Sequence, residues 1–123
     1  MVESINTKSE LVERGTSLQG IPTYGSIMIG DKGFEYYNEK NVRDFYQIPW
    51  TEIEYVLVSV NFGGRWIPRF AIQTKKNGTY SFASKDPKRV LRQIREHIPA
   101  DRIRKSLTFL QVLTRPFRKK KHS

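Results

Sequence analysis

Few side chains in this sequence have the chemistry and spacing that catalysis requires. His97 and His122 could transfer protons near neutral pH, but no sequence neighbour of either residue would orient its ring. Glu52 and Glu54 are alternate residues of a predicted strand, and paired carboxylates can act as acid and base, yet this pattern is typical of a solvated strand surface. The sequence has no glycine-rich phosphate loop, nucleophile elbow or clustered metal ligands. We therefore expect no enzymatic activity, no cofactor, no metal and no small-molecule substrate.

The segment FGGRWIPRF, residues 62–70, is the first candidate binding site. Its two glycines can adopt the positive φ of a turn between two predicted strands. In one interpretation Trp66 packs on Phe62 across the hairpin and the arginines are solvated. In the other, an exposed tip docks on a partner or on lipid headgroups, because Trp and Arg are favoured interface anchors. The residues of that tip are Arg65, Trp66, Ile67 and Arg69.

The C-terminal end is the second candidate. A basic cluster beside an apolar stripe is what adsorption to an anionic membrane surface needs, although a run of like charges can also be a disordered, solubilising tail. The residues predicted to contact a membrane or a permease are Phe109, Leu113, Arg115, Phe117, Arg118, Lys119, Lys120 and Lys121.

Charge is distributed unevenly along the 123 residues, whose net charge is +10. Residues 1–60 carry five Lys/Arg and nine Asp/Glu, a net of −4, whereas residues 61–123 carry seventeen and three, a net of +14. This asymmetry indicates an anionic partner for the second half, either nucleic acid, anionic lipid or an acidic protein face. A basic surface that only aids solubility is the alternative. The absence of cysteine and of an apolar signal segment favours a cytoplasmic protein.

Period-two alternation of apolar residues predicts about seven strands in meander order. The predicted strands are residues 11–20 (the weakest), 25–30, 33–38, 45–50, 52–62, 66–75 and 79–84. The turns GDKG (30–33) and KNGT (76–79) join two pairs of them as hairpins.

The period then changes to that of a helix. Asp86 can cap a helix that has Pro87 in its first turn and ends before Pro99. One face of this helix is apolar and the remaining faces are basic. A second helical segment is predicted from Asp101 to about Thr114, where apolar residues form a broad stripe.

Seven antiparallel strands closed by one amphipathic helix resemble a pleckstrin-homology-like split barrel. The segments IPWTEIEYV, YSFAS and DPKRVLRQI are similar to its GRAM branch. The expected organisation is an N-terminal arm (1–10), the barrel with its capping helix (11–99), and an amphipathic segment with a polybasic tail (100–123). An open sheet crossed by a helix and a small closed barrel are the alternative folds.

Longer stretches carry a closer resemblance. YGSIMIGDKGFEYYN, YQIPWTEIEYV and FGGRWIPRFAIQTKKNGTYSFASKDPKRVLR are similar to the Firmicutes family ManO, whose members are encoded beside mannose-class phosphotransferase permeases. The similarity covers residues 4–113. It implies a bacterial protein that works at the cytosolic face of such a permease, and it implies no catalytic residues.

These observations predict a non-enzymatic accessory protein that binds the permease membrane subunits, with anionic lipid headgroups as a further contact, and modulates transport or permease stability. Its expected location is cytoplasmic, peripherally associated with the membrane. The alternative is a nucleic-acid-binding regulator of the operon, which the pI near 10 favours. The lack of a helix-turn-helix pattern argues against it.

Overall fold

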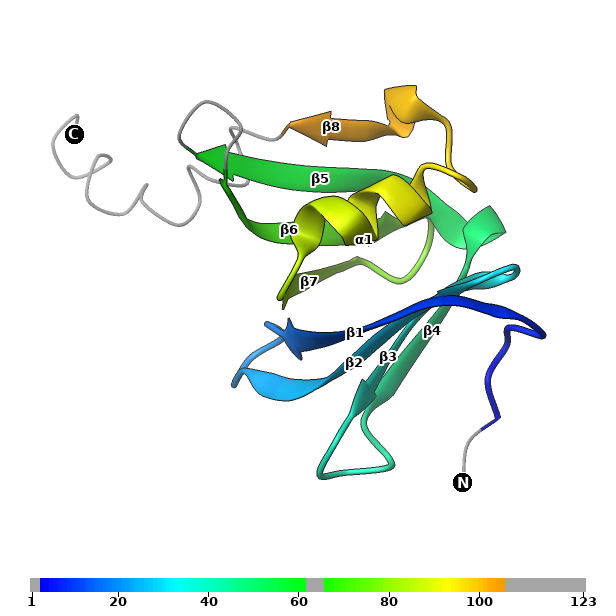
Figure 1. The fold of residues 1–123 in the computed structure, drawn as a ribbon, viewed down its shortest axis with the longest axis vertical. Coiled ribbons are helices and arrows are strands. Elements are labelled where there is room, and N and C mark those ends of the chain that lie inside the picture. The colour runs from blue at the N-terminus through cyan, green and yellow to red at the C-terminus, as the bar shows by residue number, and fades with distance from the viewer. Residues whose placement is uncertain (1–2, 62–65, 106–123) are drawn as a thin grey trace, which may run out of the picture.

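The chain forms a strongly bent sheet with one helix packed on it (Figure 1). The structure, a computed structural model, describes residues 3–61 and 66–105. Its strands are β1 (Ser9–Ser17), β2 (Thr23–Gly30), β3 (Gly33–Asn38), β4 (Phe45–Pro49), β5 (Ile53–Asn61), β6 (Trp66–Thr74), β7 (Thr79–Ser84) and β8 (Ile103–Lys105). The helix is α1 (Pro87–Ile94), and two short 3-10 turns are η1 (Trp50–Glu52) and η3 (Ala100–Arg102).

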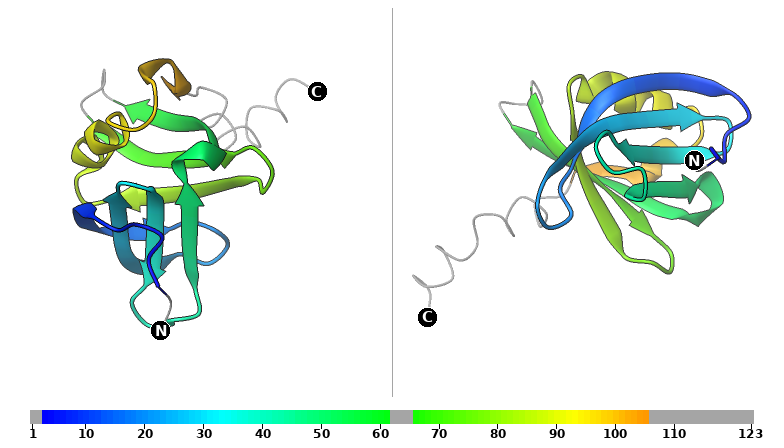
Figure 2. Two further views of the ribbon diagram at one scale, coloured as in Figure 1. Left: turned by 90° about the vertical axis from the view of Figure 1, so that its right-hand side faces the viewer. Right: turned by 90° about the horizontal axis from the view of Figure 1, so that it is seen from below.

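All eight strands belong to one sheet in the order β4-β3-β2-β1-β7-β6-β5-β8. Strands β1–β4 and β5–β7 are two antiparallel meanders, and β1 joins them by pairing with β7 over three residues. The two meanders face each other (Figures 1 and 2). Although β4 and β5 are consecutive in the chain, they stand apart in the strand order.

The core fills the space between the meanders. Period-two alternation directs one row of side chains from each strand inward. Aromatic rings occupy the centre, where the Phe34 and Phe82 centroids lie 5.1 Å apart and those of Phe34 and Phe70 lie 6.2 Å apart in an edge-to-face arrangement. The aliphatic members are Leu11, Ile27, Ile29, Ile48, Ile53, Val56, Val58, Ile72, Val90, Leu91, Ile94 and Ile98.

Helix α1 begins as the sequence predicts. Asp86 is its N-cap and accepts a hydrogen bond from the Arg89 N–H at 3.2 Å, and Pro87 occupies the first turn. The helix contacts β1, β2, β6 and β7, and so touches both meanders. Its apolar face covers the core between them, which leaves the basic faces outside.

The segment before β1 is held by two carboxylates of the hairpin formed by β2 and β3. Asp31 accepts the backbone N–H groups of Thr7 (2.9 Å) and Lys8 (3.0 Å). Glu35, whose side chain is buried, accepts the Ile5 N–H at 3.0 Å and the Asn6 side-chain amide at 2.7 Å. Residues 5–8 of the predicted arm are therefore docked on the β2–β3 turn and on β3, and the first strand starts at residue 9.

Two sequence expectations need correction. The predicted helix from Asp101 to about Thr114 is wrong for residues 101–105, which form the end of η3 and then β8, paired in parallel with β5 from Val56 to Val58. Residues 106–114 lie outside the described residues. The sheet has eight strands rather than seven because β8 pairs with β5 at the edge of the sheet. At residues 103–105 this pairing with a neighbouring strand decides the conformation, although the spacing of the apolar residues is helical.

Candidate functional site

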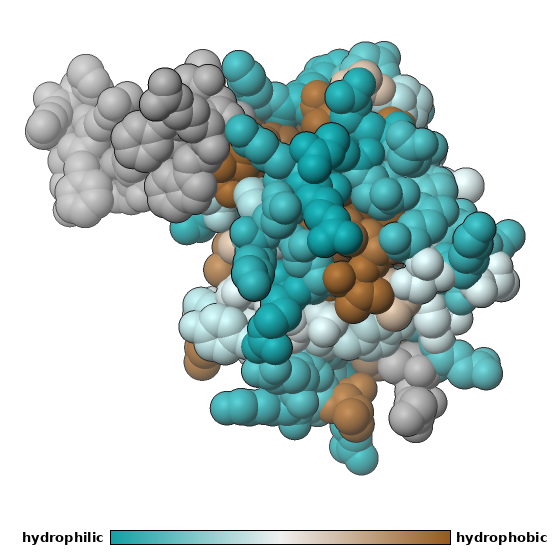
Figure 3. Space-filling model, in the orientation of Figure 1, coloured by the Kyte–Doolittle hydropathy of each residue, from teal (hydrophilic) through white to brown (hydrophobic). Residues whose placement is uncertain are grey.

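Exposed cations gather on the outer side of α1. Because Val90, Leu91 and Ile94 are buried beneath the helix, the polar residues between them must project outward. We call this surface the basic face; it comprises Lys88, Arg89 and Arg92 on α1, with Lys85 and Arg95 just outside its two ends, and all five are exposed. Figure 3 shows hydrophilic side chains over most of the surface at α1, with a hydrophobic patch beside them.

Four of these five cations are available to a partner. Arg89 lies 3.8 Å from the carboxylate of Glu13, which is largely buried and also accepts the Asp86 N–H at 2.7 Å, so this pair fastens the start of α1 to β1. The other four residues of the basic face form no ion pair within residues 3–61 and 66–105. Unpaired cations gathered along a helix and at its ends give a local positive potential that attracts anions.

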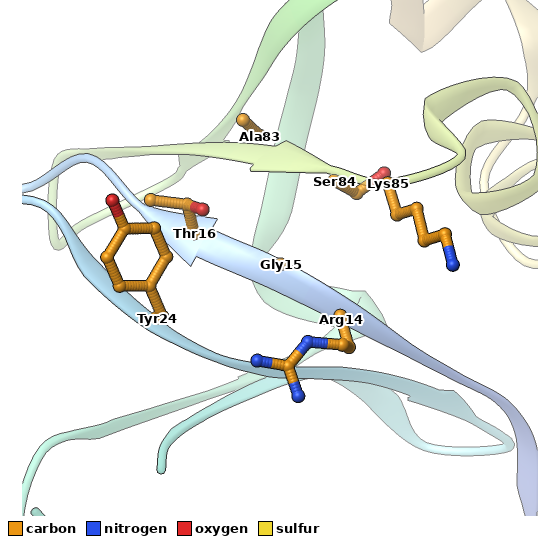
Figure 4. A pocket seen from close by; sticks show the side chains of 7 residues that line it. All are labelled: Arg14, Gly15, Thr16, Tyr24, Ala83, Ser84 and Lys85. Atoms are coloured by element: carbon orange, nitrogen blue, oxygen red, sulfur yellow. The ribbon is translucent and has the colours of Figure 1, made fainter. Parts of the chain in front are cut away.

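A pocket of about 310 Å³ opens where β1 leaves β7, beside the start of α1. We call it the β1–β7 pocket. Figure 4 shows the residues that line it: Arg14, Gly15, Thr16, Tyr24, Ala83, Ser84 and Lys85. Lys85 belongs to both the pocket and the basic face, so the two features are continuous. The sequence did not single out Arg14 or Tyr24, because the pocket is assembled from segments about seventy residues apart.

The predicted docking tip is described only in part. Ile67 is half-buried and packs against the core, which differs from the exposed position expected for it. Arg69 is also half-buried. The backbone of Trp66 opens β6 opposite Asn61, whereas the side chain of Trp66 and the whole of Arg65 lie outside the described residues.

The tail residues predicted to contact a membrane lie between 109 and 121, entirely outside the described residues. The described part of the chain contains no helix long and apolar enough to cross a lipid bilayer.

His97 has a partner that sequence reasoning missed. Its Nε2 lies 2.6 Å from Glu10 Oε1, and Gln93 donates to the same oxygen at 2.9 Å. The imidazole also stacks on the Trp50 indole, with ring centroids 4.7 Å apart and planes 9° apart. A carboxylate that orients an imidazole is part of many catalytic sites, but here it joins the last turn of α1 and the residues that follow it to the start of β1. No local pattern could reveal a pairing so distant in sequence.

The fold and the basic face together define, over residues 3–61 and 66–105, a β-dominated protein with one amphipathic helix and a cationic surface. The chain belongs to the family described as Domain of unknown function (DUF956), whose model matches residues 1–117. No curated protein matches the sequence. Among solved structures, the chain is similar to the C-terminal domain of an unknown protein from Leishmania infantum, with 11% identity, a TM-score of 0.61, and coverage of 72% of this chain and 84% of that one. At this identity the likeness shows the fold alone.

Proposed function

We propose that this protein is a non-enzymatic accessory module that binds the cytosolic face of a mannose-class phosphotransferase permease and modulates its activity or stability. The single observation that supports an anionic docking surface is the set of four unpaired, exposed cations on one side of α1. The identity of the permease rests on the ManO resemblance of residues 4–113. In this proposal the protein is cytoplasmic and associates peripherally with the membrane.

We also propose that the fold is a pleckstrin-homology/GRAM-like split barrel. Two features support this assignment. The sheet is interrupted between β4 and β5, and the helix packs on both meanders. A split sheet closed by one helix leaves the outer side of that helix free to meet a partner.

The expected strength of the contact follows from its charges. Each Lys or Arg near an anionic membrane surface contributes on the order of 1 kcal/mol. Four such cations therefore give weak, salt-sensitive adsorption by themselves, because the Debye length is only about 8 Å at physiological ionic strength. Stable binding needs added contacts from the permease, so we expect the permease rather than lipid alone to decide where the protein accumulates.

The test is co-sedimentation of the purified protein with membrane vesicles from cells that contain or lack the permease, at low and physiological salt. We expect retention at physiological salt only on vesicles that contain the permease. Equal retention on both kinds of vesicle would contradict the proposal. A mobility-shift assay with operon DNA runs in parallel, and specific retardation without permease binding would favour the operon regulator instead.

A further inference from the structure

We propose that the β1–β7 pocket binds a phosphomonoester group. This inference goes beyond the proposed function, because it concerns a single chemical group rather than an extended surface and needs no permease. The pocket brings together two cations and several hydroxyl groups, and no carboxylate is among its lining residues.

The backbone fixes the positions from which the two cationic side chains start. β1 and β7 pair in register with Gly15 opposite Ser84, so Arg14 and Lys85 occupy the next pair of positions. The Lys85 N–H also donates to the Arg14 carbonyl oxygen at 3.2 Å. Two side chains that start from adjacent, hydrogen-bonded backbone positions can close on one dianion with little reorganisation of the main chain.

The other strand pair supplies the opposite wall. Thr16 and Tyr24 are cross-strand partners in β1 and β2, and Figure 4 shows the Tyr24 ring beside Thr16, along the strands from Arg14. Tyr24 is 62% exposed although it is aromatic. Its hydroxyl and that of Thr16 can donate to phosphate oxygens, while the ring offers an apolar surface to the organic part of an ester.

Arg14 already forms an ion pair with Glu39, so a phosphomonoester would have to compete with this carboxylate for the guanidinium. Its Nη2 lies 3.3 Å from Glu39 Oε2, and the two side chains are 71% and 41% exposed. Exposed pairs of this kind contribute little stability, so a ligand can replace Glu39. A phosphomonoester carries nearly two negative charges at neutral pH and matches the planar guanidinium with two parallel hydrogen bonds. The volume of about 310 Å³ leaves room for the organic substituent as well as the phosphoryl group.

The same phosphoryl chemistry occurs in soluble phosphate esters and in the headgroup of phosphatidic acid. The first arm of the test titrates glycerol 3-phosphate into isotopically labelled protein and follows the backbone amide signals of residues 14–16 and 83–85 by NMR. We expect saturable shifts at these positions. Arg14→Gln and Lys85→Gln should each weaken binding about tenfold, as expected for loss of a charge-assisted hydrogen bond. Glu39→Gln should tighten it, because it removes the competitor.

The matched control is Lys32→Gln, which removes an exposed cation from the turn between β2 and β3. This variant should bind within about twofold of the wild type, since one distant surface charge is largely screened. Shifts that do not saturate, or an equal loss in Lys32→Gln and Arg14→Gln, would overturn the proposal.

The second arm separates the two sources of the group. Vesicles that contain phosphatidic acid are compared with vesicles of equal charge that contain phosphatidylglycerol, a phosphodiester. Preference for phosphatidic acid that is lost in Arg14→Gln would assign the lipid headgroup. Saturable glycerol 3-phosphate binding without that preference would assign a soluble ester. Absence of both would overturn the inference and would leave the permease proposal standing.

Discussion

At the scale of single residues, Glu35 is a buried carboxylate that accepts hydrogen bonds from four different residues. Burial by itself would raise the pKa of this carboxyl, but hydrogen bonds from Ser4, Tyr37, the Ile5 N–H and Asn6 outweigh the desolvation and lower it. Each donor comes from the segment before β1 or from β3. The charge therefore couples residues 4–6 to the sheet.

We expect Glu35→Gln to lower the free energy of unfolding by about 1–3 kcal/mol, because charge-assisted hydrogen bonds to a buried group are lost. Urea denaturation at neutral pH measures this change. Glu96→Gln is the control, since Glu96 is exposed and its side chain makes no hydrogen bond in the described part of the chain. A loss no larger than that of the control would show that Glu35 does not hold the segment.

Acid should weaken the fold through the same contacts. Hydrogen bonds from the Thr7 hydroxyl and from the Thr7 and Lys8 N–H groups lower the pKa of Asp31 from 3.8 to about 2, and the pKa of Glu35 is lowered from 4.5. A group whose pKa is depressed on folding stabilises the folded state above its unfolded pKa, and this stabilisation is lost as pH falls through the folded pKa. We therefore expect the melting temperature to decline below about pH 4.5, and to decline less in the double variant Asp31→Asn, Glu35→Gln. An unchanged pH profile in that variant would contradict this account.

Glycine at position 25 is required by close packing of strands. A Cβ there would lie 2.0 Å from the Tyr37 carbonyl oxygen, which is backbone and cannot move aside. Gly25→Ala should therefore cost about 1–3 kcal/mol or more of stability, as overpacking does. Gly20→Ala is the contrast: its Cβ would meet nothing within 4 Å, and only the φ of 72° opposes it, at about 1 kcal/mol. Thermal unfolding of both proteins checks this ranking, and an equal loss would contradict it.

At the scale of elements, strand β5 carries the apolar side of the second meander. Val58 is 5% exposed and faces the core, as its alternation with Val56 predicts. Val58→Asp should be severely destabilising, by about 3 kcal/mol or more, because it places an unpaired charge in the core. Val12→Asp is the matched control, since Val12 is 55% exposed on β1 and should tolerate the same change. Urea denaturation of the two variants gives the comparison. Similar denaturation midpoints would mean that Val58 does not face the core.

The sequence predicted those elements in which the spacing of apolar residues indicates which side faces the core. Alternation located β2 through β7 to within a few residues, and the Asp86-Pro87 start located α1. β8 was not predictable, because Ile103 opens an apolar stripe with helical spacing and its pairing with β5 depends on a distant edge. The alternating basic and apolar positions of α1 indicated the basic face. The β1–β7 pocket and the Glu10–His97 contact could not be indicated, because only the folded sheet brings their members together.

At the scale of the whole molecule, the residues that form the core and the residues that carry the exposed positive charge lie on opposite sides of α1. The apolar side of α1 and the inner rows of the strands form the core, while the outer side of α1 collects charge that contributes nothing to that core. Cations without partners repel one another and do not favour folding. Their concentration on one side is the observation on which the proposed anionic partner rests.

In the proposed function, the position of these cations, rather than net charge, directs binding. The most direct measurement compares two triple variants that change net charge equally: Lys88→Glu, Arg92→Glu, Arg95→Glu on the basic face, and Lys32→Glu, Lys40→Glu, Lys76→Glu in three exposed turns. Both are titrated against vesicles that contain the mannose-class permease, after their melting temperatures have been shown to match the wild type. We expect the basic-face variant to lose at least about tenfold in affinity, since three cations each contribute on the order of 1 kcal/mol. The turn variant should stay within a few-fold of the wild type. Equal losses in both variants would contradict this expectation.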